Sequence, residues 1–273
     1  MTSYLGVDWA DGCWVVVEAA DEPIVTTEPS IFNVWQRHGK RADIQSILVD
    51  IPIGLPESGT RACDNAAKEF LSSRSSTVFT IPPRNVVETD DYETARKCND
   101  NSLGSQSWWL FPRILEVDVF LQENAAARNK IYESHPEICY ASMSEGKISS
   151  KSDVDGIVDR VEILKEATQD SELLNSVYTK VKKCVENRLG GAKWHHRISK
   201  GRVDDVLDAA VLAVTAAKID LQPRNVDADY PRLPDEQNPE KDELLDNIPM
   251  EIVYPGGLDS REILDCFHLR YRD

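Results

Sequence analysis

Runs of apolar residues with the length and spacing of β-strands open the chain. Residues 4–9 and 13–19 are two such runs, and the intervening Ala10-Asp11-Gly12 suits a tight turn, so this region predicts a β-hairpin. A third strand is expected within residues 24–35. Residues 47–51 are apolar except for one acid, which is typical of a central strand, and the Pro and Gly residues that follow end it.

Helical periodicity dominates most of the remaining sequence. Pro112 lies inside one of the predicted helices and is expected to kink it or divide it in two. Residues 130–140 instead predict a fifth strand. Antiparallel strands followed by helical crossovers predict a mixed α/β sheet with helices on both faces. The predicted helices cover residues 61–72, 105–123, 155–168, 171–188 and 203–219.

The sequence changes character near its end. Residues 223–249 hold five prolines, eight acids and three bases, a composition typical of an acidic surface segment or linker. Residues 250–254 predict an edge strand. We therefore expect a main α/β domain over residues 1–222, then the acidic proline-containing segment, then a strand and helix extension over residues 250–273 that packs on the main domain.

Composition narrows the possible functions. Of 273 residues, 31 are Lys or Arg and 47 are Asp or Glu, so the net charge of −16 excludes a uniformly basic nucleic-acid-binding protein. Phosphate contacts would have to come from a local patch.

No apolar run approaches about 18 residues, the length that spans a membrane. The N-terminus lacks the pattern of a signal peptide, and the six scattered cysteines form no CxxC pair, so reduced thiols and a cytoplasmic location are expected.

Single acids within apolar runs are the informative residues, because an ionised carboxylate is costly to bury unless it is paired or binds a metal. Asp8 and Asp50 each follow or end a predicted strand. Asp208 lies in a helix that is apolar nearly all round and is therefore buried. Asp205 precedes it by three positions, on the same helix face.

These four carboxylates could meet in one cleft if the strands that carry Asp8 and Asp50 are neighbours. Their mutual repulsion would be relieved by one or two divalent cations, which also activate water for attack on phosphorus. Oxygen ligands favour Mg²⁺ or Mn²⁺ over zinc. Other interpretations stay open: Asp8 and Asp50 could bond turn amides, and Asp205 could complement the helix dipole.

Two further groups of residues carry candidate chemistry. Glu133, His135 and Glu137 occupy alternate positions of the fifth predicted strand, so their side chains would share one face of it. This face is either part of the functional site, with Glu133 the best candidate for a functional residue, or the solvated face of an edge strand. Residues 187–203 contain no acid and lead into the helix of Asp205, so they predict phosphate contacts or a solvated basic loop. The candidate substrate-binding residues are Lys193, His195, Arg197, Lys200 and Arg202, with Arg84 as a further one.

Several short motifs together resemble a known family, the predicted RNase H-like nucleases grouped as domain of unknown function 429. The resemblance covers roughly residues 4–220 and rests on the combination, since no single motif is specific. The matching motifs are Gly6-Val7-Asp8-Trp9-Ala10, Asp50-Ile51-Pro52-Ile53-Gly54-Leu55-Pro56, Arg61-Ala62-Cys63-Asp64, Glu116-Val117-Asp118, Glu133-Ser134-His135-Pro136-Glu137, Gly156 with Arg160, and Asp204-Asp205-Val206-Leu207-Asp208-Ala209.

This resemblance implies an RNase H-like five-stranded sheet of order 3-2-1-4-5 with strand 2 antiparallel, as in RuvC-type resolvases. It also implies two-metal hydrolysis of a nucleic acid or another phosphate ester. Asp8, Asp50, Asp205 and Asp208 match the acid positions of that superfamily. Asp8, Asp50 and Asp208 would bind the metal, with Asp205 or Glu133 assisting catalysis. Two alternatives stay open: a non-catalytic binding protein of the same fold, and an actin- or sugar-kinase-like phosphotransferase. Asp8 is followed by Trp9 and Ala10 rather than by the glycine and hydroxyl residues of such kinases.

Overall fold

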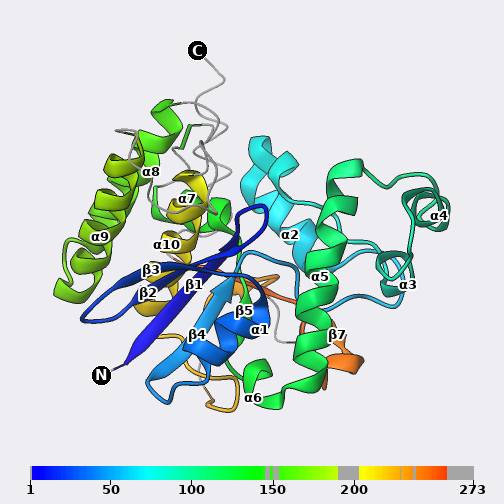
Figure 1. Ribbon diagram of the computed structural model, residues 1–273. Coiled ribbons are helices and arrows are strands. Elements are labelled where there is room, and N and C mark those ends of the chain that lie inside the picture. Colours follow the sequence, from blue (N-terminus) through cyan, green and yellow to red (C-terminus); the bar gives the residue numbers. More distant parts are fainter. Residues whose placement is uncertain are drawn as a thin grey trace.

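A five-stranded mixed sheet forms the centre of the computed structural model (Figure 1). The structure describes residues 2–144, 148–149, 154–189, 203–227, 229–235 and 238–256. The strand order is β3-β2-β1-β4-β5, with β2 antiparallel to both neighbours and β1, β4 and β5 parallel, so the predicted order is confirmed. The strands are β1 (Ser3–Trp9), β2 (Trp14–Ala19), β3 (Ile24–Glu28), β4 (Ile44–Val49) and β5 (Ile131–Glu133).

Helices cover both faces of this sheet, so its central strands are buried on both sides. Successive residues of β2 alternate between two separate hydrophobic clusters: Val15 and Val17 belong to one, and Trp14 and Val16 to the other. The sequence of β2 is therefore a continuous apolar run rather than an alternating one. The turn between β1 and β2 is formed by Asp11 and Gly12, which both have positive φ.

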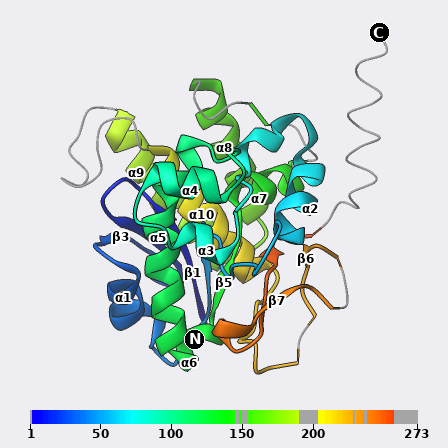
Figure 2. The ribbon, with the colours of Figure 1, turned by 90° about the vertical axis from the view of Figure 1, so that its right-hand side faces the viewer.

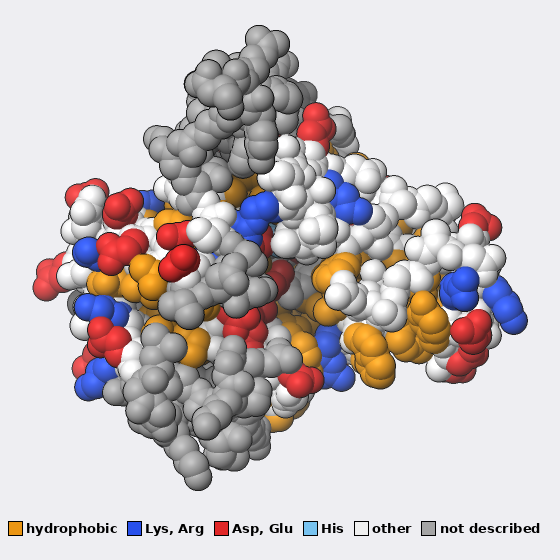
Figure 3. Space-filling model, turned by 90° about the horizontal axis from the view of Figure 1, so that it is seen from above, with side chains coloured by type: hydrophobic (Ala, Val, Ile, Leu, Met, Phe, Trp, Pro, Cys, Tyr) orange, Lys and Arg blue, Asp and Glu red, His pale blue; other side chains and the backbone are white. Residues whose placement is uncertain are grey.

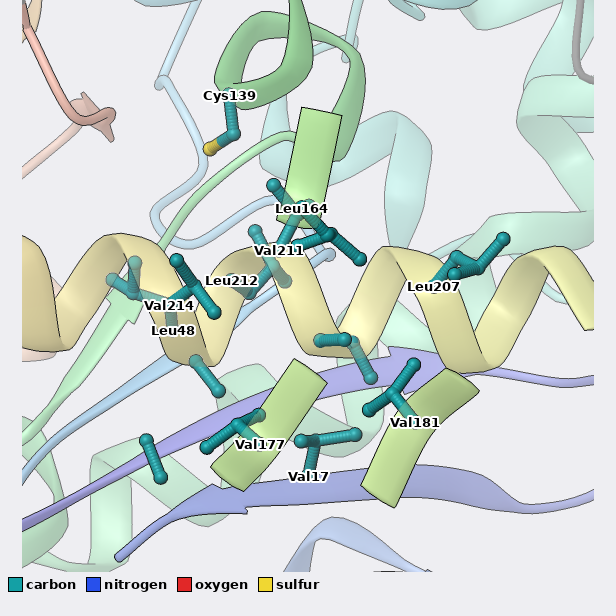
Figure 4. Close-up of a cluster of buried hydrophobic side chains, with 14 of the residues drawn as sticks. Val17, Leu48, Cys139, Leu164, Val177, Val181, Leu207, Val211, Leu212 and Val214 are labelled. Carbon is teal, nitrogen blue, oxygen red and sulfur yellow. The ribbon is translucent and has the colours of Figure 1, made fainter. Parts of the chain in front are cut away.

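The helix that contacts the sheet most closely is α10 (Val203–Lys218). A Cβ at Gly6 of β1 would lie 2.0 Å from the carbonyl oxygen of Ala209, so only glycine permits this approach. Figure 4 shows the core around α10, with Val17 and Leu48 from the sheet and Leu164, Val177 and Val181 from the neighbouring helices. Those helices are α7 (Pro136–Met143), α8 (Val154–Thr168) and α9 (Glu172–Leu189).

The opposite face of the sheet is covered by α5 (Ser105–Glu123) and by shorter helices. Of the two expected effects of Pro112, division of the helix does not occur: α5 continues through it, and Phe111, Ile114, Val117 and Leu121 pack in the core on both sides of it. The shorter elements are α1 (Ile31–Val34), the π-helix η1 (Trp35–Gly39), α3 (Arg84–Val87), α4 (Tyr92–Cys98) and α6 (Ala125–Arg128).

A third hydrophobic cluster joins α2 (Ala62–Leu71) to α7 and to the chain beyond residue 230. Figure 2 shows this late segment in orange, below α2. Val253 forms a bridge to Ser134, directly after β5, and the Ser134 hydroxyl donates to the Val253 carbonyl. The remaining elements are η2 (Ser72–Thr77), β6 (Arg232–Leu233), β7 (Lys241–Asp242), η3 (Glu243–Leu245), β8 (Ile248–Pro249) and β9 (Ile252–Val253).

One predicted strand was wrong in extent. The fifth strand was expected over residues 130–140, but β5 ends at Glu133 and Pro136 begins α7. Proline is favoured at the first helical position because its missing N–H has no partner there. The third strand, β3, lies within the range predicted for it, and the Ser30 side chain caps α1 after it. Within the described ranges, no helix is both long and apolar enough to cross a membrane.

Candidate functional site

A pocket of about 320 Å³ lies where β4 and β5 end, between α2, α5, α7 and α10. In parallel sheets the carboxyl ends of the strands commonly form the binding crevice. Figure 3 shows acidic side chains in the hollow at the middle of this face of the molecule. The lining residues are Asp50, Ile51, Pro52, Arg61, Asp64, Thr77, Val78, Phe79, Leu110, Glu133, Ser134, His135, Pro136, Glu137, Asp208 and Ile252.

Two of the predicted carboxylates meet in this pocket, although one follows β4 and the other lies on α10. Asp50 and Asp208 both line it, and Asp208 is 1% exposed. The Asp50 N–H donates to the Val7 carbonyl at 2.9 Å, which places Asp50 beside the end of β1. Asp8 follows Val7 and is buried. Asp8 and Asp205 are not among the described residues that line the pocket.

Glu133 also lines the pocket, where it belongs to a buried ionic cluster. Arg61 donates to both of its carboxylate oxygens, at 2.7 and 2.6 Å, and its Nε donates to Asp64 at 3.0 Å. Glu133 also accepts the Ile53 N–H at 2.6 Å, so it holds the loop that follows Asp50. Burial raises the pKa of Glu133, and the Arg61 guanidinium opposes that shift.

A second ionic cluster involves Glu137, whose carboxylate is paired with Arg74 and Arg160. Because Pro136 begins a helix, Glu137 lies in α7 and does not share a strand face with Glu133, so the predicted alternation was wrong. Arg160 is fully buried and donates to the Gly156 carbonyl at 2.8 Å. Arg74 interacts electrostatically with Asp208, while burial lowers the pKa of Arg74.

His135 lies between these clusters and is partly buried. Its Nε2 is 3.3 Å from the Thr77 carbonyl oxygen. A carbonyl oxygen can only accept, so this contact assigns the proton to Nε2 and leaves Nδ1 as an acceptor in the neutral ring. The contact also ties the start of α7 to the end of η2, and both residues line the pocket.

Two groups of side chains near the pocket could supply ligand atoms to a cation. Among the described residues, Cys63, Asp64 and Glu133 are a trio whose potential ligand atoms all lie within 4.8 Å of one another. This trio does not suit a cation, because the Arg61 guanidinium already pairs with both carboxylates. Asp50 and Asp208 offer hard oxygen ligands from the lining of the pocket, and carboxylate oxygens fit Mg²⁺ or Mn²⁺.

A comparison with protein families matches residues 6–232 to the family described as Protein of unknown function (DUF429). The chain belongs to the DUF429 family. No curated protein and no solved structure matches it.

In this DUF429 protein, Arg84 is the predicted substrate-binding residue that falls within the described ranges, and it forms ion pairs outside the pocket. Arg84 does not line the pocket; it donates to Asp118 at 2.7 and 3.0 Å and to Asp242 at 2.7 Å. Its charge therefore joins α3 to α5 and to the segment near β7. The other candidates, Lys193, His195, Arg197, Lys200 and Arg202, lie outside the described residues.

Several residues of this DUF429 protein's pocket were not assigned a role from the sequence. Arg61 and Asp64 had been identified only as part of a family motif, although an Arg and an Asp at this spacing on a helix start can pair. Phe79 and Leu110 had no distinguishing signal. Ile252 lies beyond the residues that match the family, yet it contributes to the pocket wall.

Proposed function

We propose that this protein is a metal-dependent nuclease of the RNase H-like type, which hydrolyses phosphodiester bonds. The observation that supports it most directly is that Asp50 and Asp208, far apart in sequence, line one pocket at the carboxyl end of a sheet of order 3-2-1-4-5. Asp8 lies near the end of β1, the neighbour of β4, and Asp50 directly follows β4. The family resemblance implies this arrangement, in which two acids come from the ends of neighbouring strands and a third comes from the helix packed against those strands.

Asp8, Asp50 and Asp208 would hold one or two Mg²⁺ or Mn²⁺ ions. A bound ion would lower the pKa of a water molecule and stabilise the charge that develops on phosphorus. Asp205 lies one helical turn before Asp208 and is buried, so it would assist by its negative charge. The phosphate ester of a nucleic acid is the substrate class that such a site would take.

The remaining side chains of the pocket would position these acids rather than bind the metal. Glu133 holds the loop after Asp50 through the Ile53 N–H, and Arg61 keeps Glu133 in place. Tyr140 donates to the Leu207 carbonyl at 2.7 Å, which fixes α10 against α7 immediately before Asp208. Arg74, which interacts with Asp208, would place a positive charge near the bound phosphate.

Hydrolysis of labelled DNA and RNA with Mn²⁺ tests this proposal. Wild-type protein is compared with Asp8→Asn and Asp208→Asn, and with Asp155→Asn as a matched control in the exposed first turn of α8. Because metal stabilisation of the transition state is worth several kcal/mol, both site variants should lose about 100-fold or more of the rate. The control should keep it. Equal rates in wild type and Asp208→Asn would exclude the mechanism.

A further inference from the structure

The two sides of the pocket differ in chemistry. Its lining includes the carboxylates of Asp50, Glu137 and Asp208, whereas Val78, Phe79 and Leu110 contribute apolar surface from the segment after η2 and from α5. In Figure 3 the acidic side chains occupy the central hollow, and hydrophobic side chains lie on the flank toward the α3–α5 part of the molecule. A ligand in this pocket therefore meets carboxylates on one side and an apolar wall on the other.

The apolar wall continues beyond the pocket along α5. Trp109 precedes Leu110 and is 74% exposed, which is unusual for so large an apolar side chain. One turn later, the Arg113 guanidinium lies over the ring of Trp9 at 4.5 Å. Trp9 follows Asp8 directly, so this face of α5 passes close to the end of β1 as well as to the pocket.

The charges around the pocket do not favour a long double helix. The protein has a net charge of −16. In the part of the chain that the structure describes, Arg61, Arg74, Arg84 and Arg160 are each paired with carboxylates. Single strands and duplexes both carry phosphates, but a duplex hides the faces of its bases and so has no flat apolar surface to place against the apolar wall. An unpaired base exposes a flat apolar face that stacks on aromatic side chains whatever its sequence.

We infer that Phe79, Trp109 and Leu110 form a stacking platform for an unpaired nucleobase, beside the phosphate that faces Asp50 and Asp208. The preferred substrate is then single-stranded DNA or RNA rather than a duplex. This inference rests on the proposed nuclease function and specifies its substrate. A cavity of about 320 Å³ is at the small end of the range for organic ligands, which suits one base rather than a folded element.

Binding can be measured apart from hydrolysis by fluorescence anisotropy in EDTA, with labelled oligonucleotides of about ten residues, in the range of single-strand binding sites. The probes are oligo-dT, oligo-rU and a mixed-sequence DNA duplex of equal length. Wild-type protein should bind both single strands at least about tenfold more tightly than the duplex. The two single-stranded probes distinguish DNA from RNA as the source of the base.

The variant Trp109→Ala should weaken single-strand binding about tenfold or more, and because Trp109 is exposed the protein should stay folded. Phe79→Leu, which keeps an apolar side chain but removes the ring, should also weaken single-strand binding. Phe32→Ala is the matched control, since Phe32 is an aromatic residue of α1 that is 54% exposed and does not line the pocket. It should leave binding unchanged.

The outcomes separate this inference from the proposed function. If the protein hydrolyses nucleic acid but Trp109→Ala binds and cleaves single strands as wild type does, the platform is excluded and the nuclease function stands. Equal affinity for single strands and duplex also excludes the platform. If single strands bind and depend on Trp109 but Mn²⁺ supports no hydrolysis, the nuclease function fails and the platform describes a binding protein instead.

Discussion

Arg61 and Glu133 form a bidentate pair in which both side chains are buried, with N···O distances of 2.7 and 2.6 Å. The pair joins the start of α2 to the end of β5. Because Glu133 also accepts the Ile53 N–H, it fixes the loop that begins at Asp50. The geometry of the candidate site therefore depends on a salt bridge that is itself inaccessible to water.

Replacement of Arg61 should reveal this dependence. In Arg61→Met the buried carboxylates of Glu133 and Asp64 lose their counter-charge, and we expect a loss of about 3–5 kcal/mol in the free energy of unfolding at neutral pH. Urea unfolding followed by circular dichroism measures it. The double variant Arg61→Met/Glu133→Gln also removes one of the unpaired carboxylate charges, so its free energy of unfolding should fall by less than that of Arg61→Met alone. An equal or larger loss would contradict an ionic role for the pair.

The same variant should respond to pH in a defined direction. Burial already raises the pKa of Glu133, and loss of Arg61 removes the main force that opposes the shift. A carboxyl whose pKa is higher in the folded than in the unfolded state binds more protons when folded, so its contribution to stability improves as pH falls. The stability deficit of Arg61→Met should therefore shrink between neutral and mildly acidic pH. A deficit that grows on acidification would contradict this assignment.

Close contact between β1 and α10 gives a second prediction, on packing. A Cβ at Gly6 would lie 2.0 Å from the Ala209 carbonyl oxygen and 2.3 Å from the Ala213 nitrogen, both of them backbone atoms. Gly6→Ala should force α10 away from the sheet and lower stability by about 1–3 kcal/mol or more. Gly104→Ala is the control, because nothing lies within 4 Å of its added Cβ. Denaturant midpoints of the two variants should differ clearly; equal midpoints would contradict the packing.

Cysteine reactivity offers a third prediction. Cys98 is exposed, whereas Cys13, Cys63, Cys139 and Cys184 are buried. Burial raises the pKa of Cys139 to about 11, so its thiol stays protonated near pH 8, where thiolates react. In a Cys266→Ser background, a thiol reagent should label one group in the native protein and none after Cys98→Ser. Rapid labelling of a further cysteine would mean that the core opens readily.

The sheet was predictable because its strands and the close-packed helix have strong local patterns. The continuous apolar runs around Val16 and Leu48, and the small and apolar residues of α10, identify elements buried on all sides. The fifth strand was predicted too long because apolar periodicity over so few residues does not separate a strand from a helix. There, the conformation is decided by Pro136, which can begin a helix but cannot donate to a strand ladder.

The candidate site was predictable in part for a similar reason. Asp50 and Asp208 stood out as acids in apolar surroundings, and both line the pocket. The partners of Glu133 and Glu137 could not be predicted, because their arginines lie far away in the sequence and a local pattern does not reveal such pairs. The ion pairs of Arg84, which was predicted to bind substrate, were also not predictable, because a basic residue after two prolines carries no sign that Asp118 and Asp242 are its partners.

The bridge between Val253 and Ser134 brings Ile252 into the pocket from beyond the residues that define the family. The acidic residues of the pocket and Ile252 thus belong to different parts of the polypeptide, which can accumulate substitutions independently. Relatives that retain the aspartates but carry a different late segment would keep the same chemistry and accept molecules of another shape. Under the proposed function, the choice of substrate in this family can therefore change through the late segment, while the acidic residues of the pocket stay as they are.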